Sequence, residues 1–152
     1  MKKLLLLGLF FIVVCSHIFA NDNFIVPGKR VNGYYLGMKK QQIINSFGKP
    51  SSKEVGAGGH ILNMKYDDYG FTFNIATADG EVCGIDVENT GYQTKEGIRV
   101  GSSYADVVET YGAPKKTSQF GPFIAVSYNG IIFKIDISLN STVTMISLTY
   151  GR

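Results

Sequence analysis

Residues 97–114 read GIRVGSSYADVVETYGAP, a stretch with the signals that begin and end a short helix. Ser103 starts a capping-box-like pattern, and Gly112 followed by Pro114 provides the stop. Sixty-four residues earlier, residues 33–50 read GYYLGMKKQQIINSFGKP, with glycines, apolar residues and a final proline at matching positions. Because the same signals occur twice, we expect a tandem repeat with one helix in each copy.

Six residues define the shared pattern and are our candidate structural positions. They are Gly37, Gly48 and Pro50 in the first copy, and Gly101, Gly112 and Pro114 in the second. We expect Gly48 and Gly112 to adopt the left-handed backbone that ends a helix. Helices of about ten residues do not persist alone in water, so each must pack on a sheet.

Alternating apolar residues predict three strands after each helix. They fall near residues 62–66, 71–75 and 82–88, and again near 124–128, 131–137 and 142–149. Asn129-Gly130 is a strong hairpin signal. The expected fold class is therefore α+β: a tandem repeat in which each short helix packs on a three- to four-stranded antiparallel meander, with the two sheets continuous.

The N-terminus predicts an exported protein. Lys2 and Lys3 precede an apolar run, and Ala20 is followed by polar residues, which is typical of a secretory signal peptide. An uncleaved anchor and a lipidated Cys15 are the alternatives. The predicted organisation is a signal peptide at 1–20, a lead-in at 21–32, repeat 1 at 33–88, a connector at 89–96 and repeat 2 at 97–150.

Composition restricts the possible partners and chemistry. Removal of Lys2 and Lys3 with the signal lowers the formal net charge from +3 to +1. No longer basic cluster remains, which argues against nucleic acid binding. Cys83 is then the last cysteine, so no intrachain disulfide can form. Its alternation with Ile85 and Val87 favours a buried strand residue.

No pattern in the chain predicts catalysis. The glycine-rich stretch at 56–59 lacks the ending of a phosphate-binding loop, and His60 alone offers one metal ligand. The aspartates at 67, 68 and 79 do not have calcium-loop spacing. We therefore expect a protein that is not an enzyme and that binds neither a cofactor nor a metal.

The glycine pattern, the short helix, the Gly-x-Pro ending and the following meander resemble the SmpA/OmlA (BamE-like) envelope domains. Duplicated, they resemble the architecture of the β-lactamase inhibitor protein. The resemblance covers most of residues 31–150 and implies an envelope protein whose helices back an antiparallel sheet. It departs from those families because this chain cannot form their disulfides and Cys15 is a poor lipidation site.

Aromatic residues left over from the predicted core are our candidates for partner binding. They are Tyr34, Tyr69, Tyr92, Phe120 and Phe123, all expected at loops or element ends. The alternative is that the two phenylalanines only cover a sheet end. The expected function is an exported periplasmic or secreted protein-binding or structural module whose partner is another envelope or extracellular protein. Membrane association is expected only if Cys15 is lipidated. An inhibitor of a secreted or periplasmic enzyme and a small hydrolase are the rival functions.

Overall fold

The computed structural model describes residues 23–151, which form two largely antiparallel sheets and two short α-helices. The predicted signal peptide, its cleavage after Ala20 and Cys15 lie outside the described residues. Within 23–151, neither helix is long or apolar enough to cross a membrane.

An eight-stranded antiparallel sheet is the main element, in the order β4-β5-β6-β7-β12-β11-β10-β9. Its strands are β4 (Ser52–Gly56), β5 (Ile61–Tyr66), β6 (Phe71–Ala76), β7 (Val82–Val87), β9 (Lys116–Phe120), β10 (Phe123–Tyr128), β11 (Ile131–Asp136) and β12 (Thr142–Thr149). Short 3-10 turns, η1 (Ala57–Gly59) and η2 (Asp67–Tyr69), join β4 to β5 and β5 to β6.

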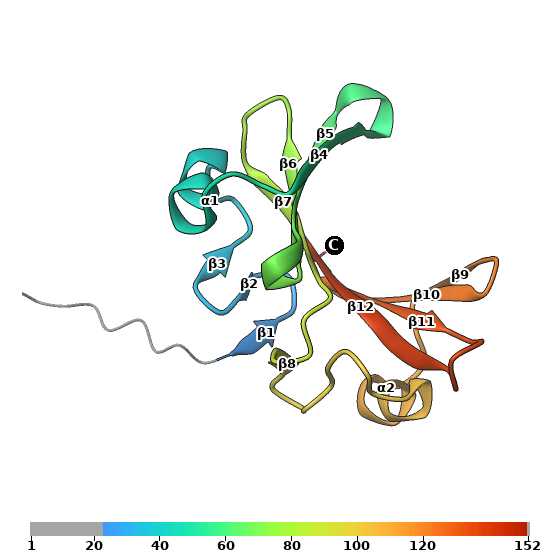
Figure 1. The fold of residues 1–152 in the computed structure, drawn as a ribbon. Coiled ribbons are helices and arrows are strands. Elements are labelled where there is room, and N and C mark those ends of the chain that lie inside the picture. The colour runs from blue at the N-terminus through green and yellow to red at the C-terminus, as the bar shows by residue number, and fades with distance from the viewer. Residues whose placement is uncertain (1–22, 152) are drawn as a thin grey trace, which may run out of the picture.

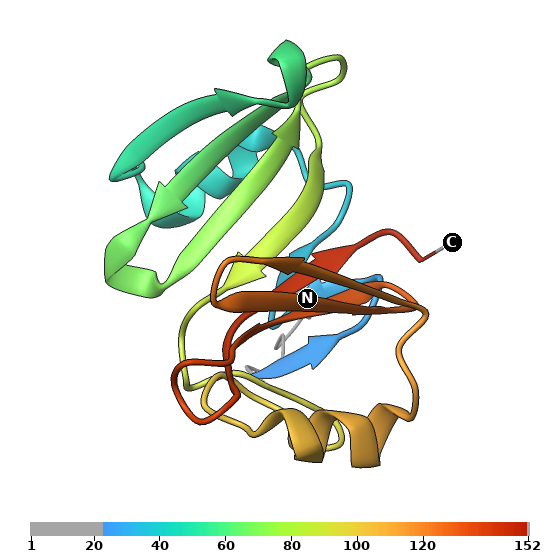
Figure 2. The ribbon, with the colours of Figure 1, turned by 90° about the vertical axis from the view of Figure 1, so that its right-hand side faces the viewer.

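The sheet bends sharply where β7 meets β12, so that β4–β7 and β9–β12 form two half-sheets set at an angle (Figures 1 and 2). Helix α1 (Lys40–Phe47) lies on the convex side of the first half-sheet, and α2 (Tyr104–Tyr111) lies on the convex side of the second. No helix covers the concave side in the described part of the chain (Figure 1).

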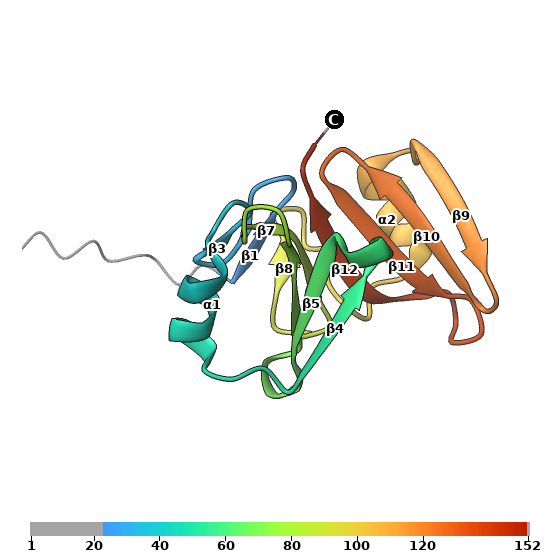
Figure 3. The same ribbon diagram turned by 90° about the horizontal axis from the view of Figure 1, so that it is seen from above.

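A second, four-stranded sheet fills the corner between the helices on the convex side (Figures 1 and 3). Its strands are β1 (Phe24–Val26), β2 (Arg30–Val31), β3 (Tyr34–Tyr35) and β8 (Gln93–Thr94), in the order β3-β2-β1-β8. β1 pairs in parallel with β8, so the N-terminal segment is tied to the link between the half-sheets. The segments expected to be a lead-in and a connector therefore provide β1, β2 and β8 of this sheet, and the start of predicted repeat 1 provides β3.

The core lies between the eight-stranded sheet and the convex layer. Ile43 of α1 and Val107 of α2 are completely buried, as are Phe73 of β6 and Phe133 of β11. One residue of each helix is therefore fully enclosed against the sheet, as expected for short helices that must pack on it. Backbone bonds fix the start of each helix: the Gly37 amide donates to the carbonyl of Val82, and the Gly101 amide donates to that of Val143.

The expected fold class, an α+β tandem repeat of helix-on-meander units, is wrong. The structure is mostly β, with one eight-stranded sheet, one four-stranded sheet and two helices of eight residues each. Strands β4 and β9 were missed because their side chains are mostly exposed and do not alternate. The four-stranded sheet was missed because its strands have two or three residues each and carry almost no periodic signal.

The two helices themselves lie where the sequence predicted them. Gly48 and Gly112 follow them with φ of 76° and 74°, but with ψ of −149° and −157°. This differs from the expected left-handed helical conformation, because that conformation has ψ near +47°. The observed region is almost exclusive to glycine, so the requirement for glycine is confirmed in a more extended geometry.

Candidate functional site

The concave side of the eight-stranded sheet, here called the bare face, is not covered by a helix in the described residues (Figures 1 and 2). Side chains alternate along each strand, so the residues between the core positions point to this side. On β11, for example, Ile131, Phe133 and Ile135 are buried in the core. Ile132 and Lys134 therefore belong to the bare face.

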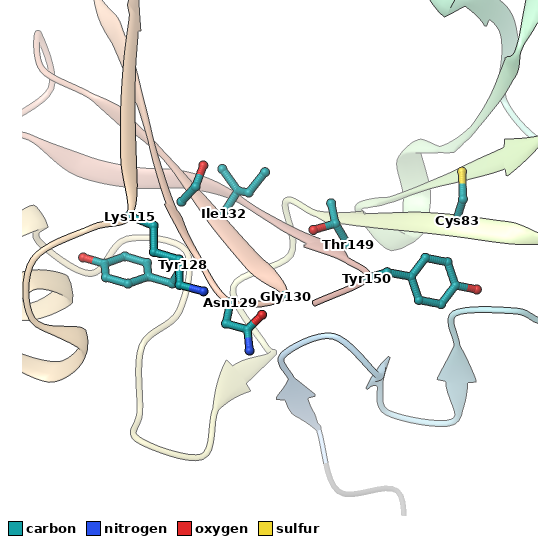
Figure 4. Close-up of a pocket in the computed structure, with 9 residues that line it drawn as sticks. Cys83, Lys115, Tyr128, Asn129, Gly130, Ile132, Thr149 and Tyr150 are labelled. Atoms are coloured by element: carbon teal, nitrogen blue, oxygen red, sulfur yellow. The ribbon is translucent and has the colours of Figure 1, made fainter. Parts of the chain in front are cut away.

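A hollow of about 430 Å³ opens where the half-sheets meet (Figure 4). Its lining residues come from β7, β10, β11, β12 and the adjoining segments: Cys83, Lys115, Ser127, Tyr128, Asn129, Gly130, Ile132, Thr149 and Tyr150. The hollow follows from the sequence, since Cys83, Ser127, Gly130 and Thr149 all have small side chains at a sharp bend. In Figure 4, Lys115 and Asn129 lie on one side of it and Tyr150 points away on the other.

Cys83 does not occupy the buried position that alternation predicted. Asn74 pairs with Gly84 and Ile75 pairs with Val82, so Cys83 is an extra residue in a β-bulge. The bulge turns its half-buried side chain towards the hollow. Burial raises the pKa of the thiol, and Sγ donates to the Asn74 carbonyl oxygen at 3.2 Å. A protonated, hydrogen-bonded thiol is a poor nucleophile.

On the bare face of the first half-sheet, several charged and amide side chains are paired with one another. Asn74 donates from Nδ2 to Oδ2 of Asp86 at 3.0 Å. Lys65 Nζ lies 2.9 Å from an oxygen of Asp67 and 4.0 Å from one of Glu88. Lys65 and Asp86 therefore already have polar partners on the same half-sheet.

The second half-sheet presents an aromatic and basic cluster, which we call the Phe-Lys cluster and define as Phe120, Phe123 and Lys134. Phe120 and Phe123 pair across β9 and β10, with ring centroids 6.5 Å apart. Lys134 Nζ lies 4.2 Å from the centre of the Phe123 ring, a cation–π distance. Phe120 is half exposed. Aromatic anchors of this kind often carry the binding energy of protein interfaces.

The five aromatic candidates divide between the two sides of the molecule. Tyr34, Tyr69 and Tyr92 gather on the convex side around Phe47 and Phe71, with ring centroids 4.7–5.1 Å from one of these two phenylalanines. Tyr34 and Tyr92 are half-buried there, and burial raises the pKa of Tyr34. Tyr69 is 46% exposed. These tyrosines act mainly as packing around the end of α1, whereas Phe120 and Phe123 lie on the bare face.

Phe120 and Phe123, expected at loops or element ends, lie at the end of β9 and the start of β10. The pairing of β9 with β10 brings both rings onto the bare face. The signal that could have identified this was the alternation of Phe123, Ala125 and Ser127 with Ile124, Val126 and Tyr128. Lys115, Asn129 and Tyr150 were not identified, since nothing local links them.

The described residues provide no evident metal centre. Among residues 23–151, no three His, Cys, Asp or Glu side chains are close enough together to hold a metal ion. Among the other structural positions, Gly37 and Gly101 have positive φ, Pro50 is buried and Pro114 is half-buried. They position the helices and do not line the hollow.

Comparison with known proteins shows the fold alone. No family model and no curated protein matches the chain, so the resemblance to the SmpA/OmlA family stays a prediction. The chain is similar to YjgB, a DUF4309 family protein of Bacillus subtilis, with a TM-score of 0.56, 15% identity and coverage of 82% of this chain and 88% of that one. It is also similar to the uncharacterized protein yfeY of Escherichia coli, with a TM-score of 0.51, 16% identity and coverage of 81% and 95%.

A third similar structure is an extracellular protein containing an SCP domain from Bacillus anthracis. The TM-score is 0.54 at 12% identity, and the match covers 76% of this chain and 44% of that one. The chain therefore spans less than half of that protein's length. At this identity the likeness carries no function from one protein to the other.

Proposed function

We propose that this chain is an exported, non-catalytic module that binds another protein through its bare face. The observation that supports this most is the pair formed by Phe120, which is half exposed, and Phe123, which is half-buried, on the concave side of the sheet. A concave surface with aromatic anchors and small side chains at its centre suits a convex part of a partner protein.

The exposed apolar groups favour the bare face, and not the convex side, as the surface that binds a partner. The convex side carries both helices and the four-stranded sheet, and its tyrosines pack against the core. The bare face has Phe120 half exposed and Ile132 and Met145 partly exposed on adjoining strands. A partner that covers these groups would remove apolar surface from water, which contributes about 25 cal/mol per Å² before the costs of association.

Site-specific photo-crosslinking tests this proposal. A photoreactive phenylalanine analogue at Ala125, which lies on the bare face between Phe123 and Ser127, should crosslink a protein partner in the native host. The matched control carries the same analogue at Glu109, an exposed position on α2, and should not crosslink that partner. Crosslinks from Glu109 alone, or equally from both positions, would place binding elsewhere.

Export is the second part of the proposal, supported by the N-terminal sequence. The expected mature protein begins at Asn21, and the intact mass of the protein recovered from the native host measures this. A species that begins at a diacylated Cys15 would instead indicate a lipid-anchored protein.

Inhibition of a secreted or periplasmic enzyme is a second candidate. It is favoured by the same aromatic pair, because a rigid concave surface with exposed rings can cover the rim of an active site. If the partner crosslinked from Ala125 is a hydrolase, the purified chain should lower its activity, and Phe120→Ala should weaken that inhibition. A crosslinked hydrolase with undiminished activity would eliminate this candidate.

A further inference from the structure

We infer that the bare-face partner inserts an acidic side chain into the hollow beside Lys115. This inference rests on the proposed function and specifies the chemistry of the partner: a protein segment that carries a carboxylate next to apolar or small residues.

The lining of the hollow selects for negative charge. Lys115 is the one formally charged residue among the nine that line it, and no carboxylate does. The remaining polar lining groups include the hydroxyls of Ser127 and Thr149 and the amide of Asn129, each able to donate a hydrogen bond. A carboxylate accepts hydrogen bonds only, so this set of donors matches it.

The charges around the hollow differ between its two sides. The charges of Asp79 and Asp86 reach Cys83, where they add to the effect of burial on the pKa of the thiol, whereas lysines lie along the side formed by β9 and β11. Lys116 lies directly opposite Ser127 on the bare face, and Lys134 lies opposite Ala125 one strand further on. No ion pair to a carboxylate is formed by Lys115, Lys116 or Lys134 within residues 23–151.

Asp136 lies on the same half-sheet and its pKa is lowered, first by the hydrogen bond from the Ser138 side chain and to a smaller extent by the charge of Lys134. Asp136 is 7% exposed and accepts from the backbone amide and hydroxyl of Ser138 at 2.9 and 2.6 Å. The other half-sheet differs, because Lys65 is already paired with Asp67 there. Charge complementarity therefore directs the acidic part of a partner to the second half-sheet and the hollow.

The two sides of the hollow indicate how such a segment would sit. Lys115 and Asn129 lie on one side of the hollow and Cys83 on the other, with the apolar side chain of Ile132 between them (Figure 4). An Asp or Glu side chain could place its carboxylate between Lys115 and Asn129 and its carbon atoms against Ile132. Loss of such a charge-assisted hydrogen bond should weaken binding on the order of tenfold or more.

Selection from a random peptide library displayed on phage tests the inference. Clones selected on the wild-type protein should be enriched in Asp or Glu at one position. The same enrichment should appear with Lys49→Gln, which alters an exposed lysine beyond α1, and should disappear with Lys115→Gln. Selection without an acidic consensus, or with the same consensus on Lys115→Gln, would overturn the inference.

Titration of the ¹⁵N-labelled protein with the best selected peptide then locates the site. Amide shifts should centre on Ser127, Gly130 and Thr149, and the Kd should rise on the order of tenfold when the acidic residue is replaced by its amide. Equal binding of both peptides, shifts on the convex side, or the same shifts with inorganic phosphate at the same concentration would each contradict a specific acidic segment.

The crosslinking experiment separates this inference from the proposed function. A partner that still crosslinks from Ala125 with undiminished yield in a Lys115→Gln background would preserve bare-face binding and refute the acidic insertion. If no partner crosslinks from Ala125 in the otherwise wild-type protein, the proposed function itself is refuted.

Discussion

Gly48 and Gly112 hold backbone conformations that other residues rarely adopt. Both have φ near 75° and ψ near −150°, and a Cβ at either position would meet no atom within 4 Å. The cost of a side chain there is therefore the cost of backbone strain. Gly112→Ala should destabilise the protein by about 1–3 kcal/mol, measured by urea unfolding, and Gly48→Ala should do the same.

Gly33→Ala is the matched control for these substitutions. Gly33 also has open space around its Cβ position, but its φ is not in the positive range. Its substitution should change the free energy of unfolding by less than about 0.5 kcal/mol. If all three variants were equally stable, the conformations assigned to the two helix ends would be wrong.

Ser103 and Asp106 provide a second prediction at single residues, this one dependent on pH. The Asp106 amide donates to Ser103 Oγ at 3.1 Å, and the Ser103 amide donates to Asp106 Oδ2 at 3.0 Å. The hydrogen bonds from Ser103 lower the pKa of Asp106. Ser103→Ala should cost about 1 kcal/mol of stability at neutral pH.

The sign of the pH effect follows from that lowered pKa. A carboxylate whose pKa is lower in the folded state stabilises the fold at pH values above its unfolded-state pKa, which is about 3.9 for aspartate. This stabilisation is lost as the pH falls through the folded-state pKa. The difference between wild type and Asp106→Asn should therefore shrink on acidification in urea melts. A constant difference at all pH values would show that the charge of Asp106 contributes nothing.

Single residues also show where sequence reasoning stops. The capping pattern and the glycine stops were predictable because each depends on neighbours within a few positions. The position of Cys83 was not, because a bulge shifts the alternation by one residue without any local marker. Phe120 and Phe123 were recognised as candidates, but their shared surface depends on the pairing of β9 with β10.

Among the elements, the turn between β1 and β2 lies directly against the β10–β11 hairpin. The Gly28 amide donates to the Gly130 carbonyl at 2.9 Å, and a Cβ on Gly130 would lie 2.5 Å from the nitrogen of Gly28 and 2.6 Å from its Cα. Because both neighbouring atoms are backbone, they cannot move aside without shifting the turn.

Gly130→Ala should therefore detach the N-terminal turn from the hairpin. We expect a larger loss of stability than for Gly112→Ala, since steric overlap adds to the strain of a positive φ. Hydrogen exchange of the Gly28 amide should accelerate, whereas that of the core amides in β6 should be affected only through the loss of global stability. Unchanged protection of Gly28 would contradict the contact.

The four-stranded sheet shows why the sequence predicted the positions of the long strands and helices better than the way they pack together. The long strands and both helices carry periodic apolar patterns, so their positions were evident from the sequence. The strands β1, β2, β3 and β8 are so short that they exist only because Ile25, Val31 and Thr94 are buried against the corner of the larger sheet. Such strands are consequences of tertiary packing and leave no local signal.

For the whole molecule, the pairing of β7 with β12 makes the two half-sheets depend on each other. Ile146 pairs with Val87 and Leu148 with Ile85, and all four side chains are completely buried. Burial of each contributes about 1.5–3 kcal/mol. The parallel pairing of β1 with β8 adds a second connection, because it joins the N-terminal segment to the link between the half-sheets. Both connections cross the boundary at which two independent units would have to separate.

Residues 21–152 should therefore unfold in a single cooperative transition, with urea curves that coincide when followed by circular dichroism and by tyrosine fluorescence. An isolated 95–152 fragment should fold poorly, since it lacks β7 and β8 and leaves the apolar edge of β12 exposed. At about 60 residues it also has too little core to compensate, and Cys83, the last cysteine of the mature chain, lies outside it. Two separate unfolding steps, or a well-dispersed amide spectrum from the fragment alone, would show that each half-sheet folds on its own. The bend between the half-sheets, and with it the hollow, would then be free to vary.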